Sequence, residues 1–224
     1  LGDAGYELHY LNIASGSCGT AVHSKEDIIR IRTAEAQAAA GLLGARYHLP
    51  FVDDIDIFYE NDLLAKVAAV VREVQPTIML VPSPQDYMED HVNAGRLAIT
   101  AAFCREMRNF PTDPPVAPVA GDVTVYHALP YGLRDGLRRR VVPEYYVDIS
   151  EMLAAKREAL AQHRSQKEWL DESQGIDAYL VTMEKMSGEV GRLSGQFEYA
   201  EGWRRHSHLG FCDEDADPLA EALG

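Results

Sequence analysis

Patterns typical of strands and helices alternate along this chain, and this alternation restricts its fold more than any other feature. Three apolar runs are each followed by a segment with apolar residues at helical spacing, namely 7–14 then 24–43, 45–51 then 61–73, and 77–81 then 92–107. Strand–helix units joined by short loops form parallel sheets with helices on their faces. The pattern therefore predicts an α/β fold with a mostly parallel sheet flanked by helices.

The second half of the chain predicts two further strands and a helical addition at the C-terminal side. The strands are expected at 123–128 and 144–149, a helix capped by Ser150 at 150–163, and a long helix or broken pair at 166–190. The last segment, 213–224, is acidic and is expected to be a frayed tail. The 224 residues are expected to form a single domain.

Composition excludes several classes of partner. The formal net charge of -14 argues against nucleic acid and against an anionic membrane surface, so a small molecule is the expected partner. No apolar run is long enough for a membrane span. The three cysteines are far apart, which supports neither a disulfide framework nor a cysteine-rich zinc site. A reducing cytoplasm is the simplest location for such a chain.

Polar loops follow the first three predicted strands, at 15–20, 53–56 and 83–91. In an open α/β sheet, ligands bind outside the carboxyl ends of the strands. The last loop ends in Asp90-His91, at the predicted start of a helix, with Asp90 as the expected N-cap. A helix N-terminus favours neutral imidazole, which is the metal-binding form. His91 is therefore a candidate metal ligand, and an exposed histidine is the alternative.

Several short motifs occur in one order along the chain. A small-residue loop at 13–20 comes first, followed by an Arg-x-x-Glu helix at 32–35 and a strand with Asp-His at 75–91. An Asp-Ile-Ser with a later His-x-Ser-Gln lies at 147–166, and a closing Ala-Glu lies at 199–202. Each motif alone is weak, but the ordered set resembles the LmbE-like, or PIG-L, family of zinc-dependent de-N-acetylases.

This resemblance implies a Rossmann-like fold and a metal site. The first strand of the family normally ends in Ala-His-Pro-Asp-Asp, where the His and the second Asp bind the metal and the first Asp is the general base. That motif is absent from these residues, so the resemblance implies that it and the N-terminal strand precede Leu1. His91 corresponds to the third ligand. Zn²⁺ is the implied cofactor, with Fe²⁺ as the alternative because His and carboxylate ligands serve both.

The implied activity is metal-dependent hydrolysis of an N-acetyl group on an amino sugar or a related small amide. A metal-bound water, deprotonated by a carboxylate, would attack the amide carbon, and Asp90 would orient His91 or a neighbour.

Two alternatives stay open: a non-catalytic small-molecule binding module on this fold, and a family hydrolase for another N-acyl group. The sequence does not determine the oligomeric state, and a homo-oligomer is one option.

Further residues acquire roles from the resemblance. Many family members carry an acid histidine three positions before the ligand histidine, where this chain has Met88. Tyr87, Asp86 and His163 are candidates to replace it. His163 is preferred, and for His163 an exposed helix-end histidine is the alternative. Arg32 and Asp54 are expected to bind substrate. For Arg32 the alternative is a solvated arginine paired with Glu35.

Three other polar positions have simpler interpretations. His206 and His208 have the spacing of a metal pair, but they follow an arginine-rich stretch and are interpreted as a surface segment. Asp53 is interpreted as a turn residue. Cys18 is interpreted as a small loop residue, because the sequence places no basic partner near it.

Overall fold

The computed structural model describes residues 1–174 and 179–223. Contacts divide the chain into two compact units, the first made of Leu1–Asp54 and Tyr146–Glu201 and the second of Ile55–Tyr145 and Gly202–Gly224. The chain passes between the units within β5 (Tyr145–Asp148) and again within β6 (Ala200–Arg205).

The first unit begins with a strand–helix–strand unit of the predicted kind. β1 (Leu8–Leu11) and β2 (Ala45–His48) are parallel, and α1 (Lys25–Leu42) connects them. A serine directly before an apolar helical pattern is a common N-cap, and the oxygen of Ser24 accepts a hydrogen bond from the Asp27 N–H at 3.1 Å. Gly44 follows the helix with a φ of 65°, a conformation that glycine adopts without steric cost.

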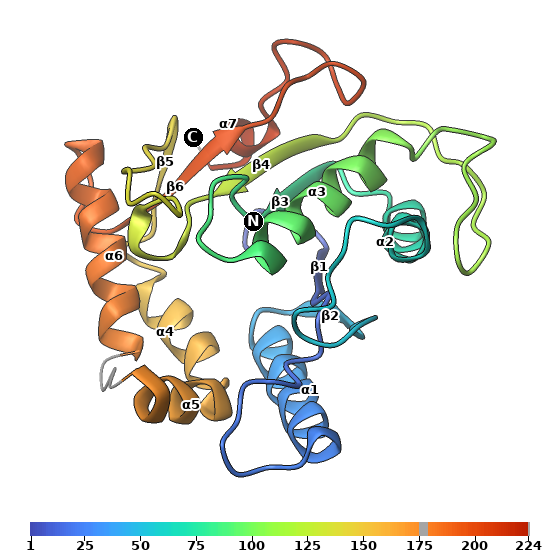
Figure 1. Ribbon diagram of the computed structural model, residues 1–224. Coiled ribbons are helices and arrows are strands. Elements are labelled where there is room, and N and C mark those ends of the chain that lie inside the picture. Colours follow the sequence, from blue (N-terminus) through green and yellow to red (C-terminus); the bar gives the residue numbers. More distant parts are fainter. Residues whose placement is uncertain (175–178, 224) are drawn as a thin grey trace. The chain divides into compact units, whose positions relative to one another are not determined.

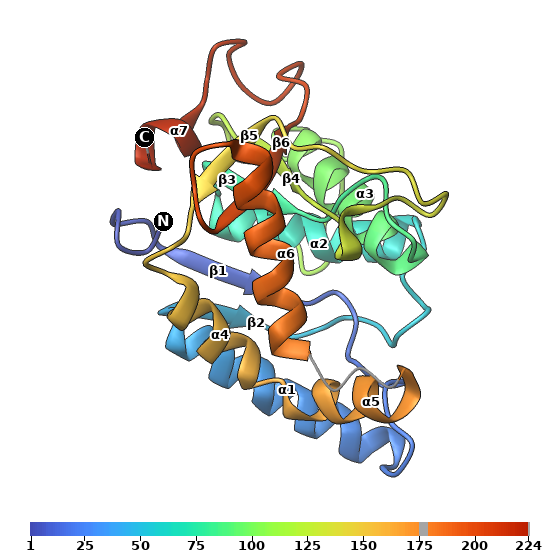
Figure 2. The ribbon, with the colours of Figure 1, turned by 90° about the vertical axis from the view of Figure 1, so that its left-hand side faces the viewer.

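Three further helices complete the first unit. They are α4 (Leu153–Ala161), α5 (Arg164–Gln174) and α6 (Tyr179–Ser194), which confirm the predicted helical addition. Figure 2 shows α4 running along α1, and α4 also packs against α6. The N-cap of α4 is Met152, so the prediction that Ser150 caps this helix is wrong. Ser150 instead donates to Asp148 at 2.6 Å. Of the predicted segment 166–190, residues 175–178 lie outside the described residues.

The second unit contains α2 (Asn61–Val74), β3 (Ile78–Val81), α3 (Glu89–Phe103), β4 (Thr124–Ala128), a 3₁₀ turn at Tyr131–Leu133, and α7 (Pro218–Leu223). β3 and β4 are parallel, whereas β4 and β6 are antiparallel. The strand order is β3-β4-β6-β5. The α/β prediction is therefore confirmed, with mixed rather than uniformly parallel pairing. α3 packs beside both β3 and α2 (Figure 1).

The core of the second unit lies between β3, β4, α3 and the C-terminal segment. It contains the buried side chains of Val81, Ala102, Val123, Val125 and Phe211. The C-terminal segment is held to it, because the Tyr126 hydroxyl donates to Asp217 at 2.6 Å and Leu219 is 4% exposed. The expectation of a frayed tail is therefore wrong for residues 213–223.

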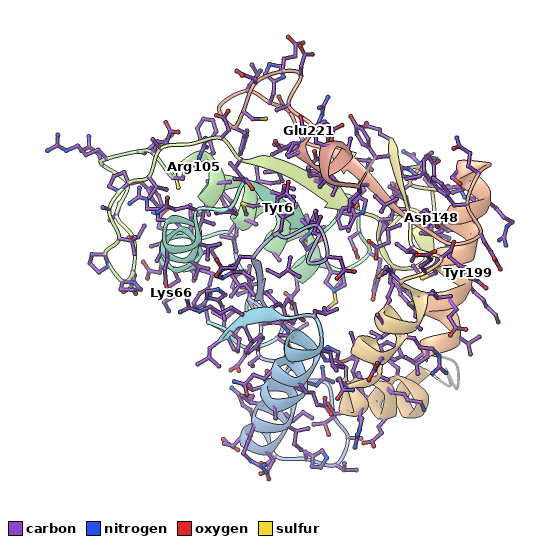
Figure 3. All side chains as sticks on the ribbon, turned by 180° about the vertical axis from the view of Figure 1, so that it is seen from behind. Tyr6, Lys66, Arg105, Asp148, Tyr199 and Glu221 are labelled. Carbon is purple, nitrogen blue, oxygen red and sulfur yellow. The ribbon has the colours of Figure 1, made fainter. Side chains whose placement is uncertain are left out.

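Two buried arginines complete the second unit. Arg72 is 2% exposed, and Arg105, which Figure 3 labels, is 6% exposed. Each guanidinium donates to four backbone carbonyl oxygens. Burying these charges is tolerated because nearly every N–H finds an acceptor.

In the described part of the chain, no helix is both long enough and apolar enough to cross a membrane.

Candidate active site

Asp54 organises the polar loop that follows β1. One carboxylate oxygen accepts the Gly16 N–H at 2.8 Å, and the other accepts the Cys18 N–H at 2.9 Å. The Asp54 N–H in turn donates to the Ser17 hydroxyl at 3.1 Å. Asp54 therefore fixes the backbone of this loop, and its carboxylate keeps further lone pairs for a ligand.

Asp53, the residue before it, binds the same region. It accepts a hydrogen bond from the Ser15 hydroxyl at 3.0 Å and forms an ion pair with Lys25. These contacts hold the pKa of the Asp53 carboxyl below its usual range, with the Lys25 interaction as the largest cause. The structure thus places Asp53 in a local structural role, in agreement with the turn interpretation.

The same loop encloses the side chain of Arg32. Its Nη2 donates to the Gly19 carbonyl at 2.7 Å. A Cβ atom at Gly16 or Gly19 would overlap the Arg32 side chain, so the present position of Arg32 depends on glycine at both positions. The Nε atom of Arg32 is buried without a hydrogen-bond partner among the described residues. Burial lowers the pKa of the guanidinium, while Asp54 and then Glu35 act to raise it.

Glu35 connects α1 to the start of α5. One of its oxygens accepts the Ser165 N–H at 2.9 Å, and the other accepts the Ser165 hydroxyl at 2.6 Å. A carboxylate is favourable there because helix N-termini present unpaired N–H groups. The Arg-x-x-Glu and His-x-Ser-Gln motifs are therefore in direct contact. This contact places His163, two residues before Ser165, beside α1.

His163 is partly buried, and burial lowers the pKa of its imidazole from the ordinary value of 6.5. Glu35 acts to raise the pKa and Arg32 to lower it, but burial is the largest cause. The ring is therefore neutral at pH 7. A neutral imidazole accepts a proton readily, and it must first be protonated before it can act as an acid.

These side chains surround a cavity of about 370 Å³ within the first unit. Its polar lining includes Tyr10, Arg32, Glu35, Tyr47, Asp54 and His163. A volume of this size is typical of small-molecule sites, which occupy about 300–1,000 Å³. Three of the predicted site residues, Arg32, Asp54 and His163, thus lie in one cavity.

Tyr10 and Tyr47 line the cavity without having been singled out from the sequence. They are register partners on β1 and β2, and their ring centroids are 5.7 Å apart. Burial raises the pKa of both, and it raises that of Tyr47 to about 12, with Tyr10 as the second cause. Both phenols are therefore hydrogen-bond donors at neutral pH. Only the register of the two strands brings them together.

The second unit holds His91 and Asp90 on the first turn of α3. His91 Nδ1 lies 3.2 Å from a carboxylate oxygen of Asp86, whose side chain is 4% exposed. Asp90 instead accepts the Ile55 N–H at 2.8 Å. The N-cap is Met88, so the expectation that Asp90 caps α3 is wrong, and Asp86 rather than Asp90 contacts His91. Asp86 also accepts the Met88 N–H at 3.0 Å.

This geometry suits His91 for metal binding through one nitrogen. A carboxylate close to Nδ1 favours the tautomer with the proton on that atom, which leaves the lone pair of Nε2 for a ligand. Within residues 1–174 and 179–223, however, no group of three His, Cys, Asp or Glu side chains could hold a metal ion. The described residues therefore offer one suitable imidazole and do not form a complete zinc site.

His127 on β4 contacts His206, which directly follows β6. His127 Nε2 lies 3.0 Å from His206 Nδ1, and His127 Nδ1 lies 3.1 Å from the Pro82 carbonyl oxygen. Because a carbonyl can only accept, Nδ1 of His127 carries its proton. His206 is partly buried in this contact, so the interpretation of His206 as a surface residue is wrong. Burial lowers the pKa of both rings.

Comparison with known proteins identifies relatives along most of the chain. Residues 1–102 match the family model described as "PIG-L: GlcNAc-PI de-N-acetylase". The chain is 30% identical over 212 residues to diacetylchitobiose deacetylase of Thermococcus kodakarensis, covering 91% of this chain and 74% of that protein.

Two solved structures share the fold. N,N'-diacetylchitobiose deacetylase from Pyrococcus horikoshii, complexed with its inhibitor MPG, has a TM-score of 0.73 at 23% identity, over 98% of this chain and 80% of that one. GalB, the 4-carboxy-2-hydroxymuconate hydratase from Pseudomonas putida KT2440, has a TM-score of 0.72 at 24% identity, over 91% and 85%. At these identities the structures show a common fold. The sequence relationship establishes that this chain belongs to the PIG-L, or LmbE-like, family of de-N-acetylases.

Proposed function

We propose that this chain is a hydrolase that removes the N-acetyl group from an amino sugar or a related small amide. The observation that carries the proposal is the 30% identity to a diacetylchitobiose deacetylase over 91% of the chain. The polar cavity of the first unit supports it, because sugar hydroxyl and acetamido groups need several hydrogen-bond partners at once.

Arg32 and Asp54 are proposed to bind the substrate in this cavity. Arg32 supplies charged N–H donors, and Asp54 supplies acceptor lone pairs beyond the two that hold the loop. His163 is proposed to take up a proton, since burial keeps its imidazole neutral at pH 7. Asp90 is proposed to support the site by binding the Ile55 N–H, which ties down the first turn of α3, where His91 lies.

His91 is proposed as one imidazole ligand of Zn²⁺, with Fe²⁺ as the alternative. The supporting observation is the Asp86 carboxylate on Nδ1, an arrangement that metal-binding histidines commonly have. The roles proposed here for Arg32, Asp54 and His163 rest on their shared position in the cavity of the first unit.

Substitution of Gly19 tests the role of Arg32. A methyl group at this position would overlap Arg32 Nη2 and lie 2.9 Å from Cζ, so Gly19→Ala must displace the guanidinium. The KM for N,N'-diacetylchitobiose is expected to rise about tenfold, or ~1.4 kcal/mol, with kcat nearly unchanged. Steady-state kinetics would measure both parameters.

Gly41→Ala is the matched control. Gly41 is an exposed position in α1, and no described atom lies within 4 Å of an added Cβ. This variant should keep the wild-type KM and gain about 0.5–1 kcal/mol of stability, because alanine favours helix. Equal KM values in the Gly19 and Gly41 variants would count against substrate binding by Arg32.

The pH profile tests the role of His163. Burial lowers its pKa below the ordinary imidazole value of 6.5, so the neutral ring is still the major form at pH 6.5, and the protonated form becomes dominant only at lower pH. We expect kcat/KM to be constant near neutral pH and to decrease as the pH falls below 6.5. In His163→Gln this acid limb should be lost along with most of the activity. Persistence of the same limb in the variant would assign it to another group.

The activity itself is tested with a panel of N-acylated compounds. Release of free amine from N-acetylated amino sugars, and not from N-propionyl analogues of the same sugars, is the expected result. Release from the longer acyl groups alone would favour a hydrolase for another acyl group. Saturable binding of the sugars with no amine release would favour a binding module on this fold.

A further inference from the structure

Arg204, on β6, binds the turn that follows β3. Its Nη1 donates to Gln85 Oε1 at 2.6 Å, and its Nη2 donates to the Ser83 hydroxyl at 2.9 Å. Burial lowers the pKa of this guanidinium, and its Nε atom is buried with no partner in the described ranges. A partly desolvated arginine that spends two donors on one turn is well placed to fix the conformation of that turn.

The turn is itself well ordered by short contacts. Ser83 is 1% exposed, and its hydroxyl donates to the Gln85 carbonyl at 2.9 Å and accepts the Gln85 N–H at 3.1 Å. Asp86 comes directly after it, with its carboxylate 3.2 Å from His91 Nδ1. The orientation of His91 thus depends on the place of Asp86, and the place of Asp86 depends on the turn.

β6 contacts the same segment at a second point. Arg204 is the register partner of His127 on β4, and His206, which directly follows β6, contacts the same histidine at 3.0 Å. His127 donates to the Pro82 carbonyl at 3.1 Å. Pro82 is also closely packed, since a Cβ on Gly95 of α3 would lie 3.1 Å from its oxygen. The segment before Asp86 is therefore held from β4, β6 and α3.

We propose that Arg204 is a positioning residue for His91, acting through the turn Ser83–Gln85 and the Asp86 carboxylate. This inference rests on the proposed role of His91. A single ammonium group cannot reproduce the two-point contact, because the guanidinium reaches Gln85 and Ser83 with separate nitrogens. Arg204→Lys should therefore retain only part of the effect.

The experiment compares Arg204→Ala and Arg204→Lys with Arg205→Ala. Arg205 is the next residue of β6, and its guanidinium donates to the Ala216 carbonyl at 2.7 Å, away from the turn. Amide hydrogen exchange of Gln85–His91 is measured by NMR or mass spectrometry, together with kcat and KM for N-acetylated amino sugars. Guanidinium chloride at low, non-denaturing concentration is then added to each variant to refill the vacated site.

For Arg204→Ala we expect faster amide exchange confined to Gln85–His91, together with a kcat about tenfold lower at unchanged KM. Added guanidinium should return both the exchange rate and kcat toward the wild-type values. Arg204→Lys should be intermediate, and Arg205→Ala should match the wild type in this segment. Wild-type exchange in Gln85–His91 of Arg204→Ala would overturn the inference, as would exchange raised equally throughout the second unit. If the wild-type chain releases no amine, the proposed function fails, while the exchange data still decide whether Arg204 orders this turn.

Discussion

Replacing His91 by alanine is expected to reduce amine release by more than about a hundredfold. Loss of an outer partner of a metal ligand costs about 10–100-fold, and loss of the ligand should exceed that. The side chain is 42% exposed, so the change in folding stability should stay below ~1 kcal/mol. Amine release, thermal unfolding and elemental analysis of bound metal measure the three quantities.

His23→Ala is a suitable control, because His23 is an exposed histidine of the first unit. It should leave turnover, stability and metal content unchanged. A folded His91→Ala protein with wild-type turnover would contradict the role of His91. Reduced turnover with unchanged metal content would show that His91 acts other than as a metal ligand.

Replacing Arg72 by methionine is expected to destabilise the second unit strongly. Arg72 donates to the carbonyl oxygens of Cys104 and Arg105 at the end of α3, and to those of Met107 and Val116 beyond it. Methionine fills a similar volume but leaves these buried acceptors without a donor. Hydrogen bonds to a charged group contribute about 1.5–3 kcal/mol each, so we expect the loss of all four to cost about 6 kcal/mol or more.

Urea unfolding measured by tryptophan fluorescence tests this expectation. In a Trp169→Phe background, Trp203 is the remaining tryptophan and reports on the second unit. The control is Arg108→Met, which removes the same charge at an exposed position and should change stability by less than ~0.5 kcal/mol. Equal unfolding free energies for the two variants would show that the Arg72 hydrogen bonds do not stabilise the unit.

The sequence predicts the local structure of this chain better than its long-range contacts. Apolar periodicity predicts the strand–helix alternation, and local chemistry predicts the Ser24 cap and the turn at Gly44. The antiparallel pairing of β4 with β6 depends on which strands become neighbours, and no local pattern contains that information. The four acceptors of Arg72 are backbone atoms, so no residue type could have indicated them.

For the candidate site, too, the sequence predicts individual residues better than the contacts between them. The motif resemblance selects Arg32 and His163, and the structure places both in one cavity. The contact between Glu35 and Ser165 brings their two segments together, and it joins residues 130 positions apart, which no local pattern indicates. From the sequence, Asp90 is expected to orient His91 or a neighbour. Helix geometry points adjacent side chains in different directions, and Asp86, in the preceding loop, contacts the imidazole instead.

Mass spectrometry of N,N'-diacetylchitobiose incubated with this chain and Zn²⁺ tests the central claim most directly. The account predicts a product lighter by one acetyl group, with one acetate and one free amine formed per turnover, and loss of this product in His91→Ala. Unchanged substrate and unchanged N-acetylated amino sugars across the panel, with a folded protein that binds them, would contradict it.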